Sequence, residues 1–291
     1  MADVQSLKKK IPWPLKVGAK LVLARVPASP ATWRRLSLFK HGRMDDPSYA
    51  WEVFNRHVGR VSGQPREGFV ALELGPGDTV SSAVIAAALG SATTFLVDVA
   101  PIAIRDLEPY RRLAAFLSDR GLDVPDLWAV SSFDELLASC RAVYLTDGIS
   151  SLRTVESGSV DLVWSHATLE HVRRRDVEAT LRETRRVLRP EGFASHQIDL
   201  RDHLADALNS LRFSEAVWES RLMSRSGFYT NRLRSSQWLE AFTRSGFLVD
   251  SMLVERWATL PTPRRKLAAP FRDMPDDDLL IADLQALLRP V

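Results

Sequence analysis

Short apolar runs alternate with helix-like segments through the middle of the chain. Five of these runs are short enough to be buried strands, and the segments between them carry apolar residues at helical spacing. The expected strands are residues 69–74, 93–99, 142–146, 160–165 and 193–198. The expected helices are residues 80–89, 101–119, 133–139 and 176–188. Because β–α alternation builds a parallel sheet with helices on both faces, the pattern predicts a doubly wound, mostly parallel α/β sheet.

Segments on both sides of this pattern complete the expected architecture. Asp46-Pro47 has the form of an N-cap followed by a first-turn proline, and it predicts a helix before the sheet. Residues 200–235 interrupt the alternation and predict a lid insertion. After the lid we expect a helix over 237–245, a strand over 247–256, and either a final edge strand or a helix over 279–288.

We divide the chain into three parts. Residues 1–67 form a basic N-terminal helical extension, and residues 68–260 form the main domain with its lid. Residues 261–291 form a C-terminal tail that completes the sheet or packs on it. Within the main domain, Arg189-Pro190-Glu191-Gly192 is expected to be a turn that leads into the fifth strand.

Charge is unevenly distributed along the 291 residues, whose formal net charge is +3. Residues 1–40 hold nine Lys or Arg and one acid, interleaved with apolar residues. Such a segment either packs on the body with a solvated basic face or makes peripheral contact with a membrane surface. No apolar run approaches the ~20 residues of a membrane span, and the single cysteine, Cys140, excludes a disulfide framework. We therefore expect a cytoplasmic protein, with contact at the inner face of the membrane as an alternative.

A turn that cradles a nucleotide is predicted where the first strand ends. Glu73-Leu74-Gly75-Pro76-Gly77 closes this strand, and Asp98 closes the second strand. Glycines let the backbone approach a ligand closely, and an acid about twenty residues further on can hold ribose hydroxyls. The two features together predict a cofactor that carries an adenosine-like group.

Four ordered blocks resemble those of class I methyltransferases that depend on S-adenosylmethionine. They are Glu-Leu-Gly-Pro-Gly at 73–77, the strand-end Asp98, the segment 161–172 and the segment 186–192. The resemblance covers about residues 68–256 and departs from the family at Asp78, where many members have a third glycine. It implies a Rossmann-like sheet of seven strands, S-adenosylmethionine as the cofactor, and methyl transfer as the activity.

The flanking segments are similar to methyltransferases of bacterial polysaccharide and glycan modification. Residues 41–44, 195–203 and 226–232 carry this narrower resemblance. It implies O-methylation of a sugar hydroxyl in a glycan, a nucleotide sugar or a lipid-linked saccharide.

The wider resemblance also assigns cofactor-binding residues at the ends of the strands. They are Glu73, Gly75, Gly77, Asp98, Val99, Asp147, Gly148 and Ser165. The first three would serve the methionine side of the cofactor, with Glu73 acting indirectly or on the ammonium group. Asp98 would accept hydrogen bonds from the ribose hydroxyls, and Val99 would flank the adenine. Asp147-Gly148 would meet the adenine edge, although Asp-Gly is also a common turn.

Methyl transfer to a sugar hydroxyl requires a group that takes up the hydroxyl proton. The candidates for this base are His196, Asp199 and His166, whereas His171 is expected to be structural. Histidine suits the role because its ordinary pKa of about 6.5 lets it accept a proton near neutral pH.

Asp199, Asp202 and His203 lie close together in sequence after the fifth strand. Two carboxylates and an imidazole on one loop can bind Mg²⁺, which would lower the pKa of a coordinated hydroxyl. The alternative is that Asp202 caps the following helix by accepting backbone hydrogen bonds.

The lid supplies the candidates for binding the acceptor. Tyr229, Asn231 and Arg232 combine an aromatic ring with hydrogen-bond donors and a cation, which suits a sugar that carries a phosphate. Arginines on a solvated helix face would look the same. If Phe213, Trp218 and Phe228 instead line an apolar pocket, an O- or N-methyltransferase of small-molecule natural products is favoured.

Two further classes of function are weaker alternatives. A non-catalytic protein that uses the fold as a cofactor-binding scaffold would not need the intact acid at Asp98. A nucleic-acid acceptor is not expected, because the body of the chain is acidic. In addition, Ser165-His166-Ala167-Thr168 stands where many base-amino methyltransferases have Asn/Asp-Pro-Pro-aromatic. The sequence does not indicate an oligomeric state.

Overall fold

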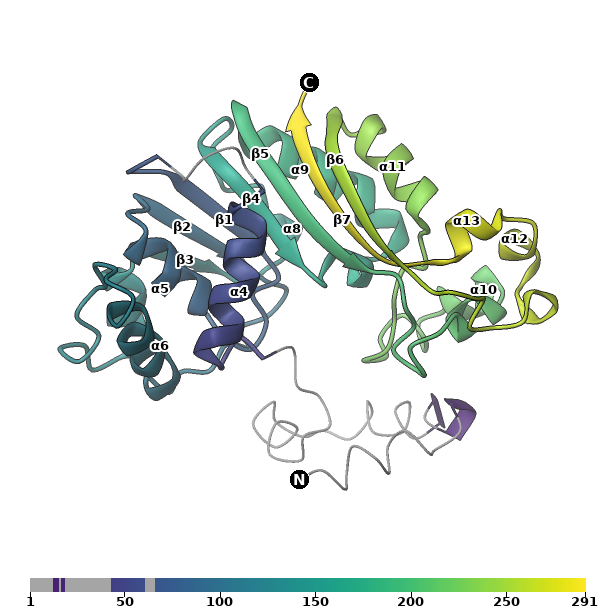
Figure 1. Cartoon of the computed structure of the whole chain (residues 1–291), viewed down its shortest axis with the longest axis horizontal. Helices are drawn as coiled ribbons and strands as arrows, with labels where there is room; N and C mark the ends of the chain where they lie inside the picture. The colour runs from purple at the N-terminus through teal and green to yellow at the C-terminus, as the bar shows by residue number, and fades with distance from the viewer. Residues whose placement is uncertain (1–12, 16, 19–42, 61–65) are drawn as a thin grey trace.

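A seven-stranded sheet forms the centre of the molecule in the computed structural model, which describes residues 13–15, 17–18, 43–60 and 66–291. The strand order is β3-β2-β1-β4-β5-β7-β6 (Figure 1). The strands are β1 (Val70–Leu74), β2 (Thr93–Val97), β3 (Ala142–Leu145), β4 (Val160–His166), β5 (Leu188–Asp199), β6 (Phe247–Arg256) and β7 (Ile281–Pro290). The pairs among β1 to β5 are parallel, and β7 is antiparallel to both of its neighbours. The predicted doubly wound, mostly parallel sheet is confirmed.

The last strand settles the ambiguity of residues 279–288. This segment is a strand, but β7 lies between β5 and β6 rather than at the edge. His196 of β5 and Met252 of β6 both pair with Ala286. An internal strand is covered on both faces, which explains why β7 is apolar over most of its length.

Helices cover both faces of the sheet (Figure 1). One core cluster includes residues of α4 (Pro47–Val58), α5 (Ser81–Ala88), α6 (Glu108–Ser118) and α7 (Phe133–Ser139). The other includes residues of α8 (Ile149–Leu152), α9 (Val177–Val187) and α11 (Ser235–Arg244). The predicted start of α4 is confirmed, since the Asp46 side chain accepts a hydrogen bond from Tyr49 N and Pro47 occupies the first turn.

Two predicted boundaries are wrong. The helix expected from residue 101 begins at Glu108, because residues 101–107 are irregular, with bends at Ala103 and Leu107. The turn expected at 189–192 lies within β5. Val160 pairs with Leu188 and Leu162 pairs with Phe193, so a register shift accommodates the extra residues.

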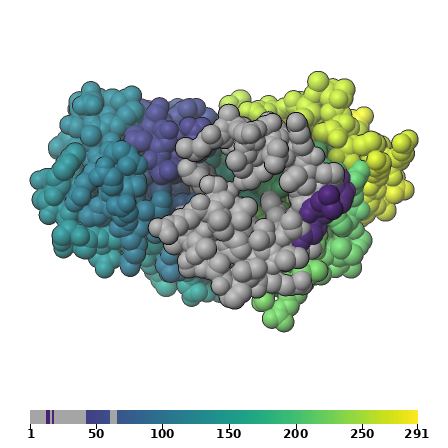
Figure 2. All heavy atoms as spheres, turned by 90° about the horizontal axis from the view of Figure 1, so that it is seen from below, coloured from purple at the N-terminus to yellow at the C-terminus, as the bar shows by residue number. Residues whose placement is uncertain are grey.

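The lid is built from short elements around its own apolar cluster. Its core consists of Leu204, Trp218, Met223, Phe228 and Tyr229. The short helices around the lid and after β6 are η3 (Asn209–Arg212), α10 (Glu215–Trp218), η4 (Arg264–Lys266), α12 (Ala269–Arg272) and α13 (Asp276–Leu279). The ring of Trp13 contacts that of Phe213 edge-on, with centroids 6.0 Å apart. Figure 2 shows the described residues near Trp13, in purple, beside the green lid.

Little of the basic N-terminal extension belongs to the described part of the chain. Its predicted contact with a membrane surface involves residues outside that part. Within the described ranges, every helix is too short or too polar to span a bilayer.

Candidate functional site

The carboxyl ends of β1, β2 and β4 meet at one edge of the sheet. Leu74, at the end of β1, pairs with Val97 on one side and with Ser165 on the other. The glycine turn, Asp98 and the segment after His166 are therefore neighbours. Ligands of open α/β sheets bind at such an edge.

The glycine turn takes a left-handed backbone at both glycines, with φ of +71° at Gly75 and +70° at Gly77. The two residues serve different purposes. A Cβ on Gly75 would lie 2.3 Å from Cγ2 of Thr168, so glycine is needed there to admit the Thr168 side chain. Gly77 N instead donates to Oδ2 of Asp98 at 3.0 Å and joins the turn to the end of β2.

Asp98 is held at the edge by backbone hydrogen bonds. Its Oδ1 accepts from Val99 N at 2.7 Å, and its carbonyl accepts from Gly148 N at 2.8 Å. The side chain of Val99 is 80% exposed, and Gly148 lies directly beside it. A fixed carboxylate next to an exposed apolar surface fits a ribose with its attached purine. The residues present therefore fit the adenosine half of S-adenosylmethionine.

Glu73 supports the edge from inside, whereas Asp147 is exposed in the turn after β3. Glu73 is buried in β1 and accepts a hydrogen bond from Ser82 Oγ in α5. Burial raises the pKa of Glu73 to about 8, and the Asp98 carboxylate adds to this rise. This placement agrees with the indirect role expected for Glu73. Asp147 N donates to Ser151 Oγ, so Asp147 forms the turn that leads into α8.

Ser165 and His196 point away from the edge into the core. Ser165 Oγ lies 2.8 Å from His196 Nδ1, and His196 stacks on Phe242 of α11. Both side chains are fully buried, and burial lowers the pKa of His196 to about 3. Strand alternation places them on the face that α9 and α11 cover. This placement argues against His196 as the base and against a cofactor contact of the Ser165 side chain.

His166 points to the opposite face, where it meets His57 of α4. The distance from His166 Nδ1 to His57 Nε2 is 3.3 Å, and His57 Nδ1 lies 2.9 Å from Ser195 Oγ. Burial lowers the pKa of His166 to about 4, so its imidazole is neutral at pH 7. His57 is a site residue that was not predicted from the sequence. Its only signal was a histidine on the apolar face of a predicted helix.

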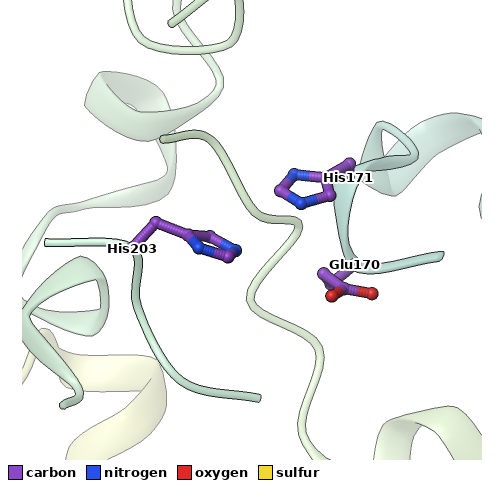
Figure 3. Close-up of side chains that lie close together, drawn as sticks. All are labelled: Glu170, His171 and His203. Carbon is purple, nitrogen blue, oxygen red and sulfur yellow. The ribbon is translucent and has the colours of Figure 1, made fainter. Parts of the chain in front are cut away.

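The three predicted metal ligands do not come together. Asp202 is buried and accepts hydrogen bonds from Leu204 N at 2.9 Å and Ala205 N at 2.7 Å, as well as from Asn209 N. The first two of these backbone N–H groups belong to a turn rather than to the helix that the alternative interpretation expected, and all three occupy the carboxylate that the predicted metal set needs. His203 lies instead near Glu170 and His171 (Figure 3).

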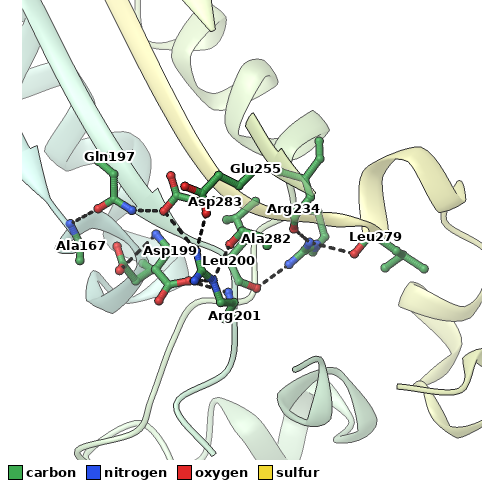
Figure 4. A network of polar contacts seen from close by, with 12 residues as sticks. Ala167, Gln197, Asp199, Leu200, Arg201, Arg234, Glu255, Leu279, Ala282 and Asp283 are labelled. Atoms are coloured by element: carbon green, nitrogen blue, oxygen red, sulfur yellow. Dashed lines mark hydrogen bonds and ion pairs between the residues drawn. The ribbon is translucent and has the colours of Figure 1, made fainter. Parts of the chain in front are cut away.

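Asp199 belongs to a network of polar contacts at the ends of β5 and β7 (Figure 4). Arg201 lies 3.2 Å from Asp199 and 3.2 Å from Glu255, and it also pairs with Asp283 at 3.8 Å. Burial raises the pKa of Asp199, and the charge of Arg201 opposes this rise. Because Arg201 already pairs with the carboxylate, Asp199 is a weaker candidate for the base than His166.

The predicted acceptor residues hold the lid in place. Asn231 Nδ2 donates to the carbonyls of Leu169 at 2.8 Å and Val172 at 3.1 Å. Arg232 Nη1 donates to the carbonyl of Phe213 at 2.7 Å, and the hydroxyl of Tyr229 bonds to the Glu219 carboxylate at 3.0 Å. Tyr229, Asn231 and Arg232 are all buried, which argues against direct contact with an acceptor.

The aromatic residues of the lid do not line a large apolar pocket either. Trp218 and Phe228 are fully enclosed in the lid cluster. A cavity of about 70 Å³ lies beside the cluster, lined by Arg174, Phe213, Arg232, Phe271 and their neighbours. It holds a few water molecules at most.

Residues 72–195 match the family model described as a methyltransferase domain. This segment runs from β1 into β5 and contains the glycine turn, Asp98 and the residues after β4. No curated protein matches the chain.

Several solved methyltransferases share the fold at low identity. One, from Methanosarcina mazei, is 15% identical over 78% of this chain and 94% of that chain, with a TM-score of 0.48. One from Leishmania major is 14% identical over 94% of this chain and 82% of that chain, with a TM-score of 0.46. The phosphoethanolamine N-methyltransferase 2 of Haemonchus contortus is 15% identical over 82% of this chain and 52% of that chain, with a TM-score of 0.46. Likeness this distant carries no argument about the acceptor.

The family match covers the part of the chain whose geometry suits S-adenosylmethionine. Both observations concern the same residues, from the end of β1 to the segment after β4. Residues 72–195 thus form a methyltransferase domain, and the chain is an S-adenosylmethionine-dependent methyltransferase of class I.

Proposed function

We propose that the chain methylates a hydroxyl oxygen of a polar acceptor, namely a sugar hydroxyl in a glycan, nucleotide sugar or lipid-linked saccharide. The observation that carries this proposal is the position of His166 at the carboxyl end of β4, where His57 Nε2 lies 3.3 Å from its Nδ1. A hydroxyl is a weak nucleophile that must lose its proton during transfer, whereas an amine in its neutral form attacks without help from a base. A base at this edge therefore favours an oxygen acceptor.

In this proposal the ends of β1, β2 and β3 hold the cofactor. Asp98 would bind the ribose hydroxyls, Gly77 would lie against the methionine side, and Val99 would pack on the adenine beside Gly148. Bound S-adenosylmethionine supplies a methyl group that the sulfonium has already activated. The main task of the chain is then to align the acceptor oxygen with that methyl group.

His166 takes up the hydroxyl proton in this mechanism. The acceptor oxygen would then displace S-adenosylhomocysteine from the methyl carbon, and the bond to that oxygen would replace the carbon–sulfur bond. His57 is a positioning residue, because it lies between His166 and Ser195 and fixes the orientation of the His166 ring.

The lid supports a polar acceptor over an apolar natural product. The aromatic residues that could have lined an apolar pocket are used in the core of the lid itself. Near the ends of β4 and β5, the side chains of Asp199 and Arg201 are charged and only half-buried.

The proposal is tested by incubating the purified chain with labelled S-adenosylmethionine and a panel of acceptors. The panel contains nucleotide sugars, lipid-linked saccharides, free glycans, amines and aromatic phenols, with Asp98→Ala as the inactive control. We expect label in a sugar ether that resists mild acid and base. Transfer only to amines or phenols would contradict the proposal, and cofactor binding without any transfer would favour the scaffold alternative.

A further inference from the structure

Three potential metal ligands converge beyond the ends of β4 and β5. Glu170 and His171 belong to η1 (Leu169–His171), which follows β4, and His203 lies on the loop after β5. One ligand atom from each residue lies within 4.8 Å of the others. The two imidazole rings face each other, with centroids 4.9 Å apart and planes 26° apart (Figure 3). We propose that Glu170, His171 and His203 bind a divalent transition-metal ion.

Glu170 provides an independent reason to place a cation here. Its side chain is 2% exposed, and its Oε1 accepts a hydrogen bond from Asp199 N at 3.3 Å. Its Oε2 is buried and has no hydrogen-bond partner among the described residues. A buried carboxylate oxygen without a partner is costly, and a metal ion bound to it removes that cost.

His171 is oriented as a metal ligand would be. Its Nδ1 lies 2.8 Å from the carbonyl oxygen of Tyr229. A carbonyl can only accept a hydrogen bond, so Nδ1 carries the proton and Nε2 carries the lone pair. Histidines that bind metals commonly donate their second ring N–H to a carbonyl or carboxylate in this way.

The lid fixes this ligand set. Asn231 N donates to the carbonyl of Glu170 at 2.7 Å, and Asn231 Nδ2 donates to that of Leu169 at 2.8 Å. Tyr229, which orients His171, is itself held through its hydroxyl by Glu219. The polar lid residues that the sequence suggested for the acceptor therefore position η1 and its two ligands.

The donor set selects the class of metal. Two imidazoles and one carboxylate suit Zn²⁺ or Mn²⁺ better than Mg²⁺, which prefers oxygen ligands throughout. Three protein ligands also leave a coordination position for another molecule. If the proposed function holds, an acceptor hydroxyl bound at that position would lose its proton more readily.

Direct metal binding tests the site apart from catalysis. The full chain is freed of metal with a chelator and titrated with Zn²⁺, Mn²⁺ and Mg²⁺ by calorimetry and competition with a metal indicator. We expect one equivalent of Zn²⁺ or Mn²⁺ to bind more tightly than Mg²⁺. Glu170→Gln and His203→Asn should each weaken binding at least about tenfold.

Two control variants remove a histidine and a carboxylate that lie outside the proposed metal site. His166→Asn removes a histidine from the other face of the sheet, and Glu255→Gln removes an exposed carboxylate that pairs with Arg201. Both should bind the metal as the unchanged chain does. Circular dichroism and the affinity for S-adenosylmethionine report on folding. If Glu170→Gln does not fold, the metal affinity of His203→Asn tests the site.

Different results would contradict the metal site and the proposed function. No stoichiometric Zn²⁺ or Mn²⁺ binding, or equal weakening in His166→Asn, overturns the metal site. Metal binding without sugar methylation supports the site and contradicts the proposed function. Sugar methylation that persists in a chelator overturns the role of the site in acceptor activation.

Discussion

The two halves of the carboxyl edge of the sheet are built in different ways. At β1 and β2 the cofactor groups lie within three residues of a strand end, and backbone N–H groups hold them. At β4 and β5 the polar groups come from η1, the loop after β5 and α4, and residues of the lid lock them. The first half therefore depends on local sequence, and the second depends on contacts between segments far apart in the chain.

The largest effect is expected in the acceptor half, at the proposed base. His166→Asn should lower kcat by about 10²- to 10⁴-fold, because it removes the group that accepts the proton. The affinity for S-adenosylmethionine should stay within twofold of the unchanged chain (about 0.4 kcal/mol). Steady-state kinetics and calorimetry of the same preparations measure both quantities.

His57→Gln serves as a second variant for this half. It removes the imidazole beside His166 but leaves His166 in place, so it should lower kcat less and shift the pH profile of kcat. An unchanged kcat in His166→Asn would show that the proton goes elsewhere, with Asp199 as the remaining candidate.

A variant in the cofactor half should instead weaken the binding of S-adenosylmethionine. Asp98→Ala should weaken S-adenosylmethionine binding about 100-fold or more, since hydrogen bonds to a charged group contribute about 1.5–3 kcal/mol each. Metal binding at Glu170, His171 and His203 should not change. Calorimetric titrations with the cofactor and with Zn²⁺ give both affinities.

Asp147→Ala is the matched control for that variant, because it removes a carboxylate from the turn after β3. It should alter cofactor affinity far less than Asp98→Ala. Equal losses would mean that the general charge of the edge, rather than a specific ribose contact, determines the affinity.

The free energy of unfolding of a Gly75 variant tests the junction between the two halves. Gly75→Ala should lower the free energy of unfolding by about 2–4 kcal/mol, from the left-handed backbone and the clash with Thr168. Gly68→Ala is the control, because Gly68 has a φ of +80° but nothing within 4 Å of an added Cβ. Adding Thr168→Ala should restore part of the free energy of unfolding in Gly75→Ala but not in Gly68→Ala. Urea unfolding of the single and double variants measures this difference. Equal losses at the two glycines would contradict the clash.

The smallest expected effect is on the pH dependence of stability, through the buried His196. In the folded chain its pKa is about 3, whereas it returns to 6.5 on unfolding. The unfolded state therefore binds more protons below pH 6.5, and stability falls as the pH drops. His196→Gln can keep a hydrogen bond to Ser165 and removes this titration. It should reduce the loss of stability between pH 6.5 and 5 by up to about 2 kcal/mol. Identical slopes in both proteins would place the acid sensitivity at other groups.

The positions of the residues in the cofactor half could be predicted from sequence order because they adjoin the strands. A glycine turn and a strand-end acid are visible without knowing any distant contact. The faces of β5 were harder to assign, because strand parity alone does not say which helices cover which face. His196 and Ser195 are adjacent, yet one packs under α11 and the other meets His57.

The acceptor half could not be predicted because the partners of its residues are remote. Asn231 and Arg232 have the composition of a ligand site, but they bond to backbone carbonyls 19 to 62 positions away. Composition does not distinguish an arginine that binds a phosphate from one that binds the backbone. His171 was expected to be structural, and only the approach of His203 and Glu170 reveals its alternative role.

Thr168 gives the two halves a thermodynamic link. Its side chain fills the space beside Gly75, and it precedes Glu170 by two residues, so the turn at β1 and η1 cannot move independently. A ligand that shifts Thr168 at one half changes the affinity of the other half by a factor that is the same in both directions. Cofactor exchange and acceptor binding are thus coupled equilibria.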